Sequence, residues 1–260
     1  MAAATDGPED SGASNSSSSP ASDSKRPSQD SKPKLKPNFR YAFFIQTQIS
    51  LLITASDPKT FVTLIAGKGS EEVEFVVHKE FVCHHCAVLE AAFKSNFIEG
   101  RTQTYRFPEV NGPVIQKLVQ WFYSQDINIQ SLEEEVYQNL ETRALIQLWI
   151  LADKLLLRSL QNLILRKLDL MRARFGMLPT LTYRYAYENT SKGSLLRLFL
   201  VHRAAGMSRS YIDSHPQRFP REMLVEMVVA MGNEHNFGDD HFGRESNWSQ
   251  YEVKDGPKSV

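Results

Sequence analysis

The chain has little cysteine, no excess of charge of either sign and no long hydrophobic run. Its two cysteines, Cys83 and Cys86, are too few and too close together for a disulfide framework, which fits a reducing compartment. Lysine and arginine, 30 in all, balance 30 aspartates and glutamates, so no net charge attracts nucleic acid or an acidic membrane. The longest apolar stretch, residues 41–55, is interrupted by polar residues and is too short to span a bilayer. The composition therefore predicts an intracellular protein, in the cytoplasm or the nucleus, that binds neither nucleic acid nor membranes.

Motifs for catalysis and for nucleotide binding are also missing. The sequence has no Gly-x-Ser-x-Gly elbow, and no Gly-x-Gly-x-x-Gly follows a predicted strand. The Gly-Lys-Gly-Ser run at residues 67–70 lacks the spacing of a phosphate loop and is best read as a turn. The Cys-His-His-Cys run at residues 83–86 has zinc-ligand types, but four consecutive residues of one helix cannot converge on one ion. We therefore expect no enzyme activity, metal or cofactor, and keep a metal-dependent enzyme as the alternative.

Both ends of the chain are polar. Residues 1–38 are rich in serine and contain a single large aliphatic residue, Leu35. Such a segment cannot bury enough apolar surface to offset its ordering entropy of roughly 1–2 kcal/mol per residue, so we expect a disordered tail. It also lacks the apolar centre of a secretory signal peptide. Residues 233–260 are polar and contain glycine, which predicts a second flexible tail.

The strongest structural signals begin at residue 61. Residues 61–66 are mostly apolar, residues 72–78 alternate between apolar and polar, and a glycine-rich turn separates them. This pattern predicts a β-hairpin. After Lys79 the apolar residues recur with a helical period, which predicts a helical hairpin.

A third strand and an amphipathic helix are expected next. Residues 104–107 predict the strand, which ends at Pro108, and Pro113 suits the first turn of the helix. The side chains expected on its inward face are Ile115, Leu118, Val119 and Phe122. Residues 126–129 alternate again and predict a short edge strand.

The order of these elements, together with particular residues, resembles a BTB/POZ domain. The matching segments are residues 62–65, 75–79, 107–110, 121–123, 150–155 and 160–162. The resemblance implies an α+β fold in which a small sheet is flanked by a cluster of helices. We place this BTB/POZ domain at residues 41–160.

Helical periodicity dominates the second half of the chain. Ser131 and Glu134 form a capping box, which predicts a helix start. The periodic pattern continues almost to residue 174, too long for one helix of a globular domain, so we expect a break near residues 157–159. Five basic side chains at residues 158–174 suggest a nucleic-acid surface, but cations near a helix end also complement the helix dipole, and we prefer that explanation.

Residues 181–231 are again amphipathic and helical. Within them, Tyr-Glu-Asn-Thr at residues 187–190 precedes Ser-Leu-Leu-Arg at residues 194–197. This block resembles the carboxy-terminal half of the small BTB proteins of filamentous fungi. The resemblance implies an all-helical extension, which we place at residues 161–232.

Residues 41–53 predict a leading helix that is apolar on two sides and must be covered on both. In the BTB family the leading helix packs on the partner subunit. The resemblance therefore implies a homodimer, with the contact at Phe44, Ile45, Ile49 and Leu52. Burial of this helix within its own chain is the alternative.

One triplet carries the functional hypothesis. Phe97-Ile98-Glu99 lies between the helical hairpin and the third strand, where BTB domains that act as cullin adaptors carry a hydrophobic-x-Glu triplet. The resemblance implies that Phe97 fills an apolar pocket of a cullin and that Glu99 accepts a hydrogen bond or ion pair. The alternative is a loop in which Phe97 closes its own core.

Two function hypotheses follow, both of them for a protein–protein interaction module. The first is a substrate adaptor for a cullin-based ubiquitin ligase. The second is a self-associating scaffold or a transcriptional co-regulator without a ligase role.

Overall fold

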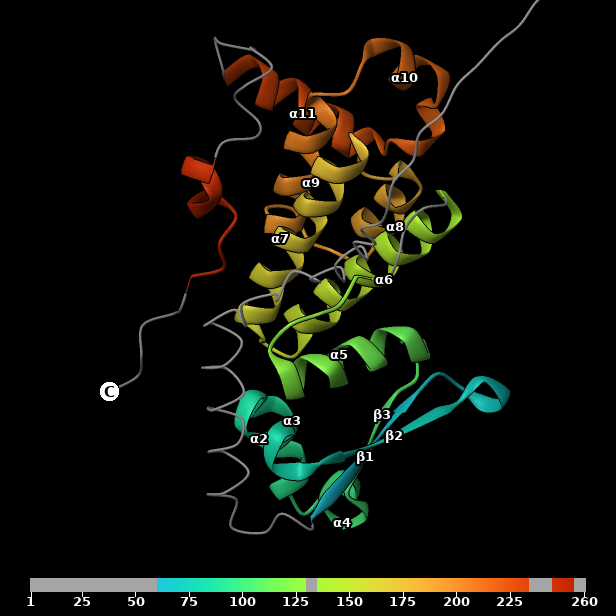
Figure 1. The fold of residues 1–260 in the computed structure, drawn as a ribbon, viewed down its shortest axis with the longest axis vertical. Coiled ribbons are helices and arrows are strands. Elements are labelled where there is room, and N and C mark those ends of the chain that lie inside the picture. The colour runs from blue at the N-terminus through green and yellow to red at the C-terminus, as the bar shows by residue number, and fades with distance from the viewer. Residues whose placement is uncertain (1–59, 130–134, 234–244, 255–260) are drawn as a thin grey trace, which may run out of the picture. The chain divides into compact units, whose positions relative to one another are not determined.

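A small sheet and two successive groups of helices make up the part of the chain that the computed structural model describes, residues 60–129, 135–233 and 245–254 (Figure 1). All of these residues belong to one compact unit. The predicted leading helix, with Phe44, Ile45, Ile49 and Leu52, lies outside the described residues, as do residues 1–38.

The sheet has the three strands that the sequence predicts, in the order β2-β1-β3. They are β1 (Phe61–Ala66), β2 (Val73–His78) and β3 (Thr104–Phe107). β1 pairs antiparallel with β2 and parallel with β3. The fold is α+β, as expected.

The turn of the hairpin depends on Gly67. Its φ of +84° lies in the left-handed region, and a Cβ there would come 2.7 Å from the Glu71 carbonyl oxygen. Only glycine meets both conditions without strain. The turn continues into the 3-10 helix η1 (Gly69–Glu71), so residues 67–70 form a hairpin turn, as predicted.

A helical hairpin follows the sheet, as expected. It consists of α2 (Lys79–His85) and α3 (Ala87–Lys94), with Cys86 between them. The Cys86 sulfur accepts a hydrogen bond from the Leu89 amide at 3.5 Å and so caps α3. A one-turn helix that the sequence did not predict, α4 (Ile98–Thr102), comes next.

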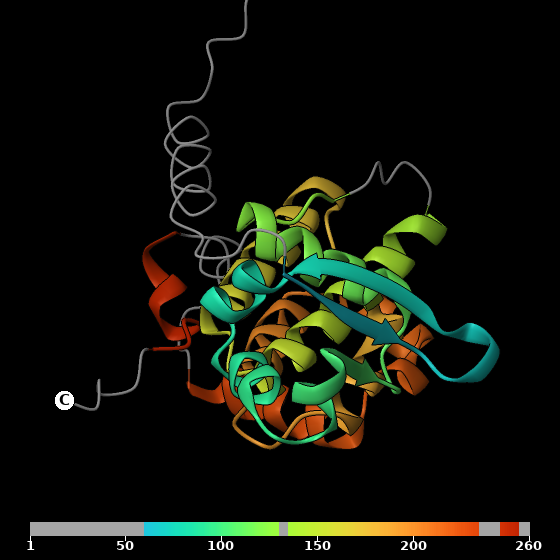
Figure 2. The same ribbon diagram turned by 90° about the horizontal axis from the view of Figure 1, so that it is seen from below.

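Helix α5 (Gly112–Ser124) carries Pro113 in its first turn, as predicted, and packs against β1 and β2 (Figures 1 and 2). Ile115, Leu118 and Phe122 are fully buried on its inward face. α5 also packs against α6 and so joins the sheet to the helices that follow.

The predicted edge strand at residues 126–129 is wrong: these residues form no strand. Their polar backbone groups are bound locally instead. The Ser124 hydroxyl bonds both the amide and the carbonyl of Asp126, and the Asp126 carboxylate accepts from the Ile127 amide at 2.8 Å. With Ile127 fully buried, the segment is fixed without a neighbouring strand.

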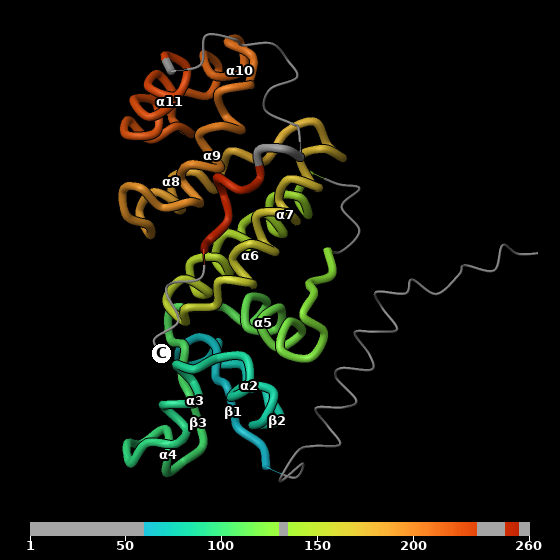
Figure 3. The backbone as a smooth tube through the Cα atoms, turned by 90° about the vertical axis from the view of Figure 1, so that its left-hand side faces the viewer, coloured from blue at the N-terminus to red at the C-terminus, as the bar shows by residue number. Residues whose placement is uncertain are grey.

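The long helical stretch is broken, as predicted. α6 (Glu135–Lys154) and α7 (Arg158–Phe175) lie side by side (Figure 3). Leu156 takes a left-handed conformation with φ of +57°, and the Leu157 amide donates to the Ala152 carbonyl at 2.8 Å. The predicted capping box of Ser131 and Glu134 lies outside the described residues.

The all-helical extension is confirmed. It contains η2 (Thr180–Thr182), α8 (Tyr183–Glu188), α9 (Leu195–Ala205), α10 (Arg209–Ser214), η3 (Pro216–Arg218) and α11 (Arg221–Asn233). α11 packs along α9. No helix in the described ranges is long and apolar enough to cross a membrane.

The expectation of a flexible tail at residues 233–260 is wrong for residues 245–254. They include a 3-10 helix, η4 (Glu245–Gln250), and pack against α7 and α9 (Figure 3). Tyr251 is only 4% exposed. The segment is ordered because the aromatic side chains of Trp248 and Tyr251 pack against Phe199, although its other residues are mostly polar.

Candidate protein-interaction site

The triplet Phe97-Ile98-Glu99 forms the start of α4, where the chain leaves the helical hairpin. Phe97 is the N-cap residue, and Ile98 and Glu99 open the helix. The side chains of Phe97 and Ile98 are 76% and 62% exposed. The alternative in which Phe97 closes its own core is therefore wrong, because the ring points away from the core that Phe93 enters.

The backbone around the triplet is held firmly. The Ser95 hydroxyl donates to the Ala92 carbonyl at 2.7 Å and accepts from the Phe97 amide at 3.2 Å. Gly100 passes so close to Ser95 that a Cβ would lie 1.8 Å from the Ser95 carbonyl oxygen, so the residue here must be glycine. The two exposed side chains therefore project from a fixed turn.

Gln103 anchors the other end of α4. It adopts a left-handed conformation with φ of +51°, and its side-chain amide donates to the Phe93 carbonyl at 3.1 Å. Its own carbonyl accepts from the Thr63 amide of β1 at 2.9 Å. The α4 turn is thus tied to both the helical hairpin and the sheet.

A surface hollow of about 380 Å³ lies next to the triplet. It is lined by Ile98, Glu99, Thr102, Thr104, Tyr105 and Arg106. Burial, and after it the negative charge of Glu99, raise the pKa of the Tyr105 hydroxyl. An exposed aromatic ring, an isoleucine and a half-buried carboxylate beside a hollow can together receive an apolar side chain and a hydrogen-bond donor of a partner protein.

The corner between β2 and α2 is fixed by a contact that the sequence analysis missed. The Tyr123 hydroxyl accepts from the His78 amide at 3.0 Å and lies 2.8 Å from His78 Nδ1. A hydroxyl can accept one hydrogen bond and take part in a second as donor or acceptor, so both contacts form at the same time. His78 thus joins the sheet to α5 and holds the start of the helical hairpin.

The Cys-His-His-Cys run does not lie on one helix, so the geometry assumed for it was wrong. α2 ends at His85, and Cys86 lies at the break before α3. Burial raises the pKa of both the Cys83 and the Cys86 thiols, which keeps them protonated. Among the described residues, no group of three or more histidine, cysteine, aspartate and glutamate side chains could hold a metal ion.

His85 makes the fold sensitive to acid. Burial, and after it the neighbouring His84, lower the pKa of His85 from 6.5 to about 4. Nε2 is buried and has no hydrogen-bond partner in the described structure, and the ring lies 5.5 Å from that of Trp121. The unfolded chain therefore binds a proton more readily than the folded chain between pH 6.5 and 4.

We expect the free energy of unfolding to fall by about 1–2 kcal/mol through His85 as the pH drops from 6.5 to 4, a figure reduced for the part of the ring that water reaches. Urea denaturation across this range measures it. His85→Gln should lose this part of the pH dependence, whereas His84→Gln should keep most of it, because burial is the larger cause. Identical pH profiles for the parent and His85→Gln would contradict the assignment.

Comparison with known protein families decides the identity of the part of the chain that contains the sheet. The family model of the BTB/POZ domain matches residues 59–168. These residues form a BTB/POZ domain. The match covers the sheet, the helical hairpin, the exposed triplet, α5, α6 and the first part of α7. A search of the curated proteins found no match, so the similarity to fungal proteins stays a prediction.

The BTB domain contains a buried ion pair between α5 and α6. Lys117 Nζ lies 2.6 Å from Glu141 Oε1, and the two side chains are only 11% and 9% exposed. Lys117 also donates to the Asn128 carbonyl at 3.4 Å. A single lysine thus joins α5, α6 and the segment wrongly expected to be a strand.

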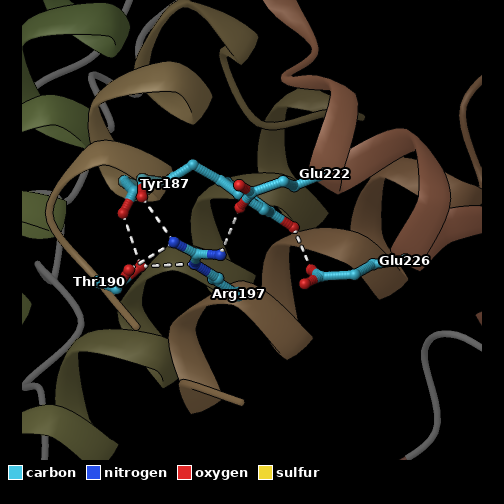
Figure 4. A network of polar contacts seen from close by, with 6 residues as sticks. Tyr187, Thr190, Arg197, Glu222 and Glu226 are labelled. Atoms are coloured by element: carbon cyan, nitrogen blue, oxygen red, sulfur yellow. Dashed lines mark hydrogen bonds and ion pairs between the residues drawn. The ribbon is translucent and has the colours of Figure 1, made fainter. Parts of the chain in front are cut away.

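Beyond the BTB domain, Arg197 connects the two motifs that the sequence analysis singled out (Figure 4). Its guanidinium donates to the Thr190 hydroxyl at 3.0 Å, to the Tyr187 carbonyl at 2.6 Å and to the Thr190 carbonyl. It also pairs with Glu222 of α11 at 3.0 Å and lies 4.3 Å from the centre of the Tyr187 ring.

The Tyr187 hydroxyl completes this network by donating to Glu226 at 2.6 Å. Burial, and then this hydrogen bond, raise the pKa of Tyr187. The spacing of Tyr-Glu-Asn-Thr and Ser-Leu-Leu-Arg therefore has a structural cause. The arginine of the second motif satisfies the carbonyl groups at the end of α8, where the first motif lies.

The basic residues of α7 are largely paired. Arg166 lies 2.8 Å from Glu252, Lys167 lies 2.7 Å from Asp126, and Arg172 lies 2.9 Å from Asp169. Cations held by acidic partners within the chain contribute less to a nucleic-acid surface. This pairing agrees with the preference for a structural role of these residues.

Proposed function

We propose that the protein is a substrate adaptor for a cullin-based ubiquitin ligase and that Phe97, Ile98 and Glu99 contact the cullin. The class of function rests on the BTB/POZ domain, since such domains mediate protein–protein interactions. The single observation that carries the finer assignment is the exposed Phe97 ring on a turn that is fixed at both ends. This role places the protein in the cytoplasm or the nucleus.

Two neighbouring apolar side chains on a rigid turn favour a protein contact. Because the turn is already ordered, a partner that covers Phe97 and Ile98 does not have to fix the backbone first. Aromatic anchors of this kind contribute most of the energy of an interface, whereas charges at the rim mainly set orientation. Glu99, half-buried beside Tyr105, suits the second role.

Phe97→Ala should weaken cullin binding by ~30-fold or more, which corresponds to loss of an anchor worth about 2 kcal/mol. Glu99→Ala should weaken it mildly. Isothermal titration of the full chain with a purified cullin measures both. Because Phe97 is exposed, the melting temperature of the Phe97→Ala variant should stay within about one or two degrees of the parent's, as expected for a surface substitution.

Phe61→Ala is the matched control, since Phe61 is also an exposed aromatic residue but lies on β1. It should leave cullin affinity unchanged. Equal affinity of the parent and the Phe97→Ala variant would refute the site, and a parent that binds no cullin would refute the adaptor role.

The second candidate is a self-associating scaffold or transcriptional co-regulator. The observation that favours it is an outward apolar stripe on α11 formed by Leu224, Val225, Val228 and Val229. Such a stripe on a helix is typical of a protein contact. Sedimentation of the full chain distinguishes the two hypotheses: a stable assembly of identical chains that binds no cullin supports the scaffold. Under either hypothesis we also propose a homodimer, with its contact at Phe44, Ile45, Ile49 and Leu52.

A further inference from the structure

Residues 248–253, called the 248–253 segment below, run from the end of η4 onto α7 and are held there through their backbone as well as their side chains. The side chain of Asn162 on α7 contacts both backbone groups of Val253. Its oxygen accepts from the Val253 amide at 2.8 Å, and its nitrogen donates to the Val253 carbonyl at 3.3 Å. The side-chain amide thus pairs with the backbone donor and the backbone acceptor of a single residue, so this contact recognises main chain rather than a particular side chain.

Two aromatic side chains of the same segment provide the anchors. The Tyr251 ring lies 5.5 Å from that of Phe199 on α9, and its hydroxyl lies 2.7 Å from His202 Nδ1. The Trp248 ring lies 6.2 Å from Phe199. Tyr251 is almost fully buried, although it comes from a short polar segment.

Arg203 lies beneath these rings. Its side chain is 4% exposed and pairs with Asp169 at 3.1 Å. Its guanidinium is 5.1 Å from the ring centre of Phe199, 6.0 Å from that of Trp248 and 5.7 Å from that of Tyr251. Nε and Nη1 are buried and have no hydrogen-bond partner among the described residues.

This arrangement differs from an ordinary core contact in what happens when it opens. A purely apolar surface would be left facing water, whereas the Nε and Nη1 groups of Arg203 would gain the hydrogen bonds that they lack in the closed state. At the rim, the exposed ion pair of Arg166 and Glu252 helps to orient the segment along α7 but contributes little to its stability. Opening of the 248–253 segment should therefore cost less free energy than exposing a purely apolar surface of the same size.

We propose that the α7–α9 surface formed by Asn162, Arg166, Phe199, His202 and Arg203 is a binding site for a short peptide of the pattern Trp-x-x-Tyr-Glu-Val, which the chain's own 248–253 segment occupies. Residues 234–244 connect this segment to α11. A tether of this length gives an effective concentration on the order of millimolar, so the site is mostly occupied in the isolated chain. The site and its ligand are independent of the cullin contact.

A fluorescent peptide with the sequence of residues 245–254 tests the proposal on the full chain. The double variant Trp248→Ala/Tyr251→Ala should vacate the site and bind this peptide saturably. The unaltered chain should bind it at least ~30-fold more weakly, because its own segment competes at an effective concentration on the order of millimolar. Fluorescence anisotropy measures both affinities.

Two matched controls define the contact. In the vacated variant, Asn162→Ala should weaken peptide binding by ~10-fold, the effect of losing two hydrogen bonds to the peptide backbone. Asn139→Ala, on α6, should not change it. A peptide in which alanine replaces the tyrosine should not bind. A folded vacated variant that does not bind the parent peptide would overturn the proposal.

Hydrogen exchange of the unaltered chain keeps the proposal testable if the double variant does not fold. The Val253 amide should exchange many times faster than the amides in the middle of α9, because the segment opens without global unfolding. Equal rates would show that the segment is part of the core and would contradict a peptide site. A dimer that dissociates on Trp248→Ala/Tyr251→Ala would identify the occupant as the segment of a second copy and would overturn occupation within one chain.

Discussion

Arg197→Ala should lower the free energy of unfolding by about 2–4 kcal/mol, the range for leaving two buried or part-buried backbone acceptors without their charged donor. The substitution removes the guanidinium group that donates to the carbonyl oxygens of Tyr187 and Thr190. These two acceptors, near the end of α8, then lose their hydrogen bonds to Arg197. It also removes the cation beneath the Tyr187 ring. Urea denaturation followed by circular dichroism measures the loss.

The control for this prediction is Arg184→Ala. Arg184 lies on α8 as well, but its side chain is 73% exposed, and its closest approach to the Glu188 carboxylate is a loose 3.8 Å. An exposed pair of this kind contributes little, so we expect a change within about 0.5 kcal/mol. Arg197→Lys should also be strongly destabilising, because one ammonium group cannot reproduce the planar guanidinium contacts. A loss below about 1 kcal/mol for Arg197→Ala would contradict the structural role given to the network.

The second large effect concerns the ion pair between α5 and α6. Lys117→Met should cost about 3–5 kcal/mol, because it leaves the Glu141 carboxylate buried without its partner. Glu141→Leu should be similarly destabilising. The double variant Lys117→Met/Glu141→Leu should recover most of the loss, since it removes both charges and replaces them with apolar side chains.

A double-mutant cycle measures this coupling. The exposed pair of Lys94 and Glu90 is the matched control, because its side chains are 66% and 38% exposed. Lys94→Met should change the free energy of unfolding by about 0.5 kcal/mol or less. Additive losses for Lys117→Met and Glu141→Leu would show that the two buried groups do not depend on each other.

Local patterns predicted most of the BTB domain. The β-branched run at residues 61–66 and the alternation at residues 72–78 need only their own side chains to indicate strands. The break between α6 and α7 followed from length alone, and the left-handed Leu156 provides it. These elements were predictable because local preference and tertiary packing agree in them.

The wrong or missing predictions concern segments whose conformation depends on contacts with residues elsewhere in the folded chain. Residues 126–129 alternate as a strand would. In the folded chain, however, the Ser124 hydroxyl and the Lys117 ammonium group donate hydrogen bonds to their backbone carbonyls, in place of a neighbouring strand. The five-residue helix α4 is too short for a periodic signal, and its close approach to Ser95 is a property of the folded chain. No pattern within either segment contains this information.

The packing of residues 245–254 was missed for a similar reason. Their composition is polar, and the burial of Tyr251 depends on Phe199, His202 and Arg203, which belong to α9. A signal was nevertheless present, because Trp248 and Tyr251 are two large aromatic residues three positions apart in an otherwise polar stretch. Aromatic pairs of this kind indicate attachment to a folded surface.

For the interaction site, the sequence located the residues but not their exposure. A hydrophobic-x-Glu triplet fits a partner contact and a core residue equally well. The direction of the Phe97 ring depends on Ser95, Gly100 and Gln103, which together set the path of the chain. The exposed ring is therefore what favours a partner over the core.

Hydrogen exchange of the full chain with and without a purified cullin tests the proposed function most directly. The account predicts slower exchange on complex formation at residues 96–106, which include α4 and most of β3, and little change at residues 245–254. Protection confined to another surface, or the absence of any complex, would contradict the assignment of Phe97, Ile98 and Glu99 as the cullin contact.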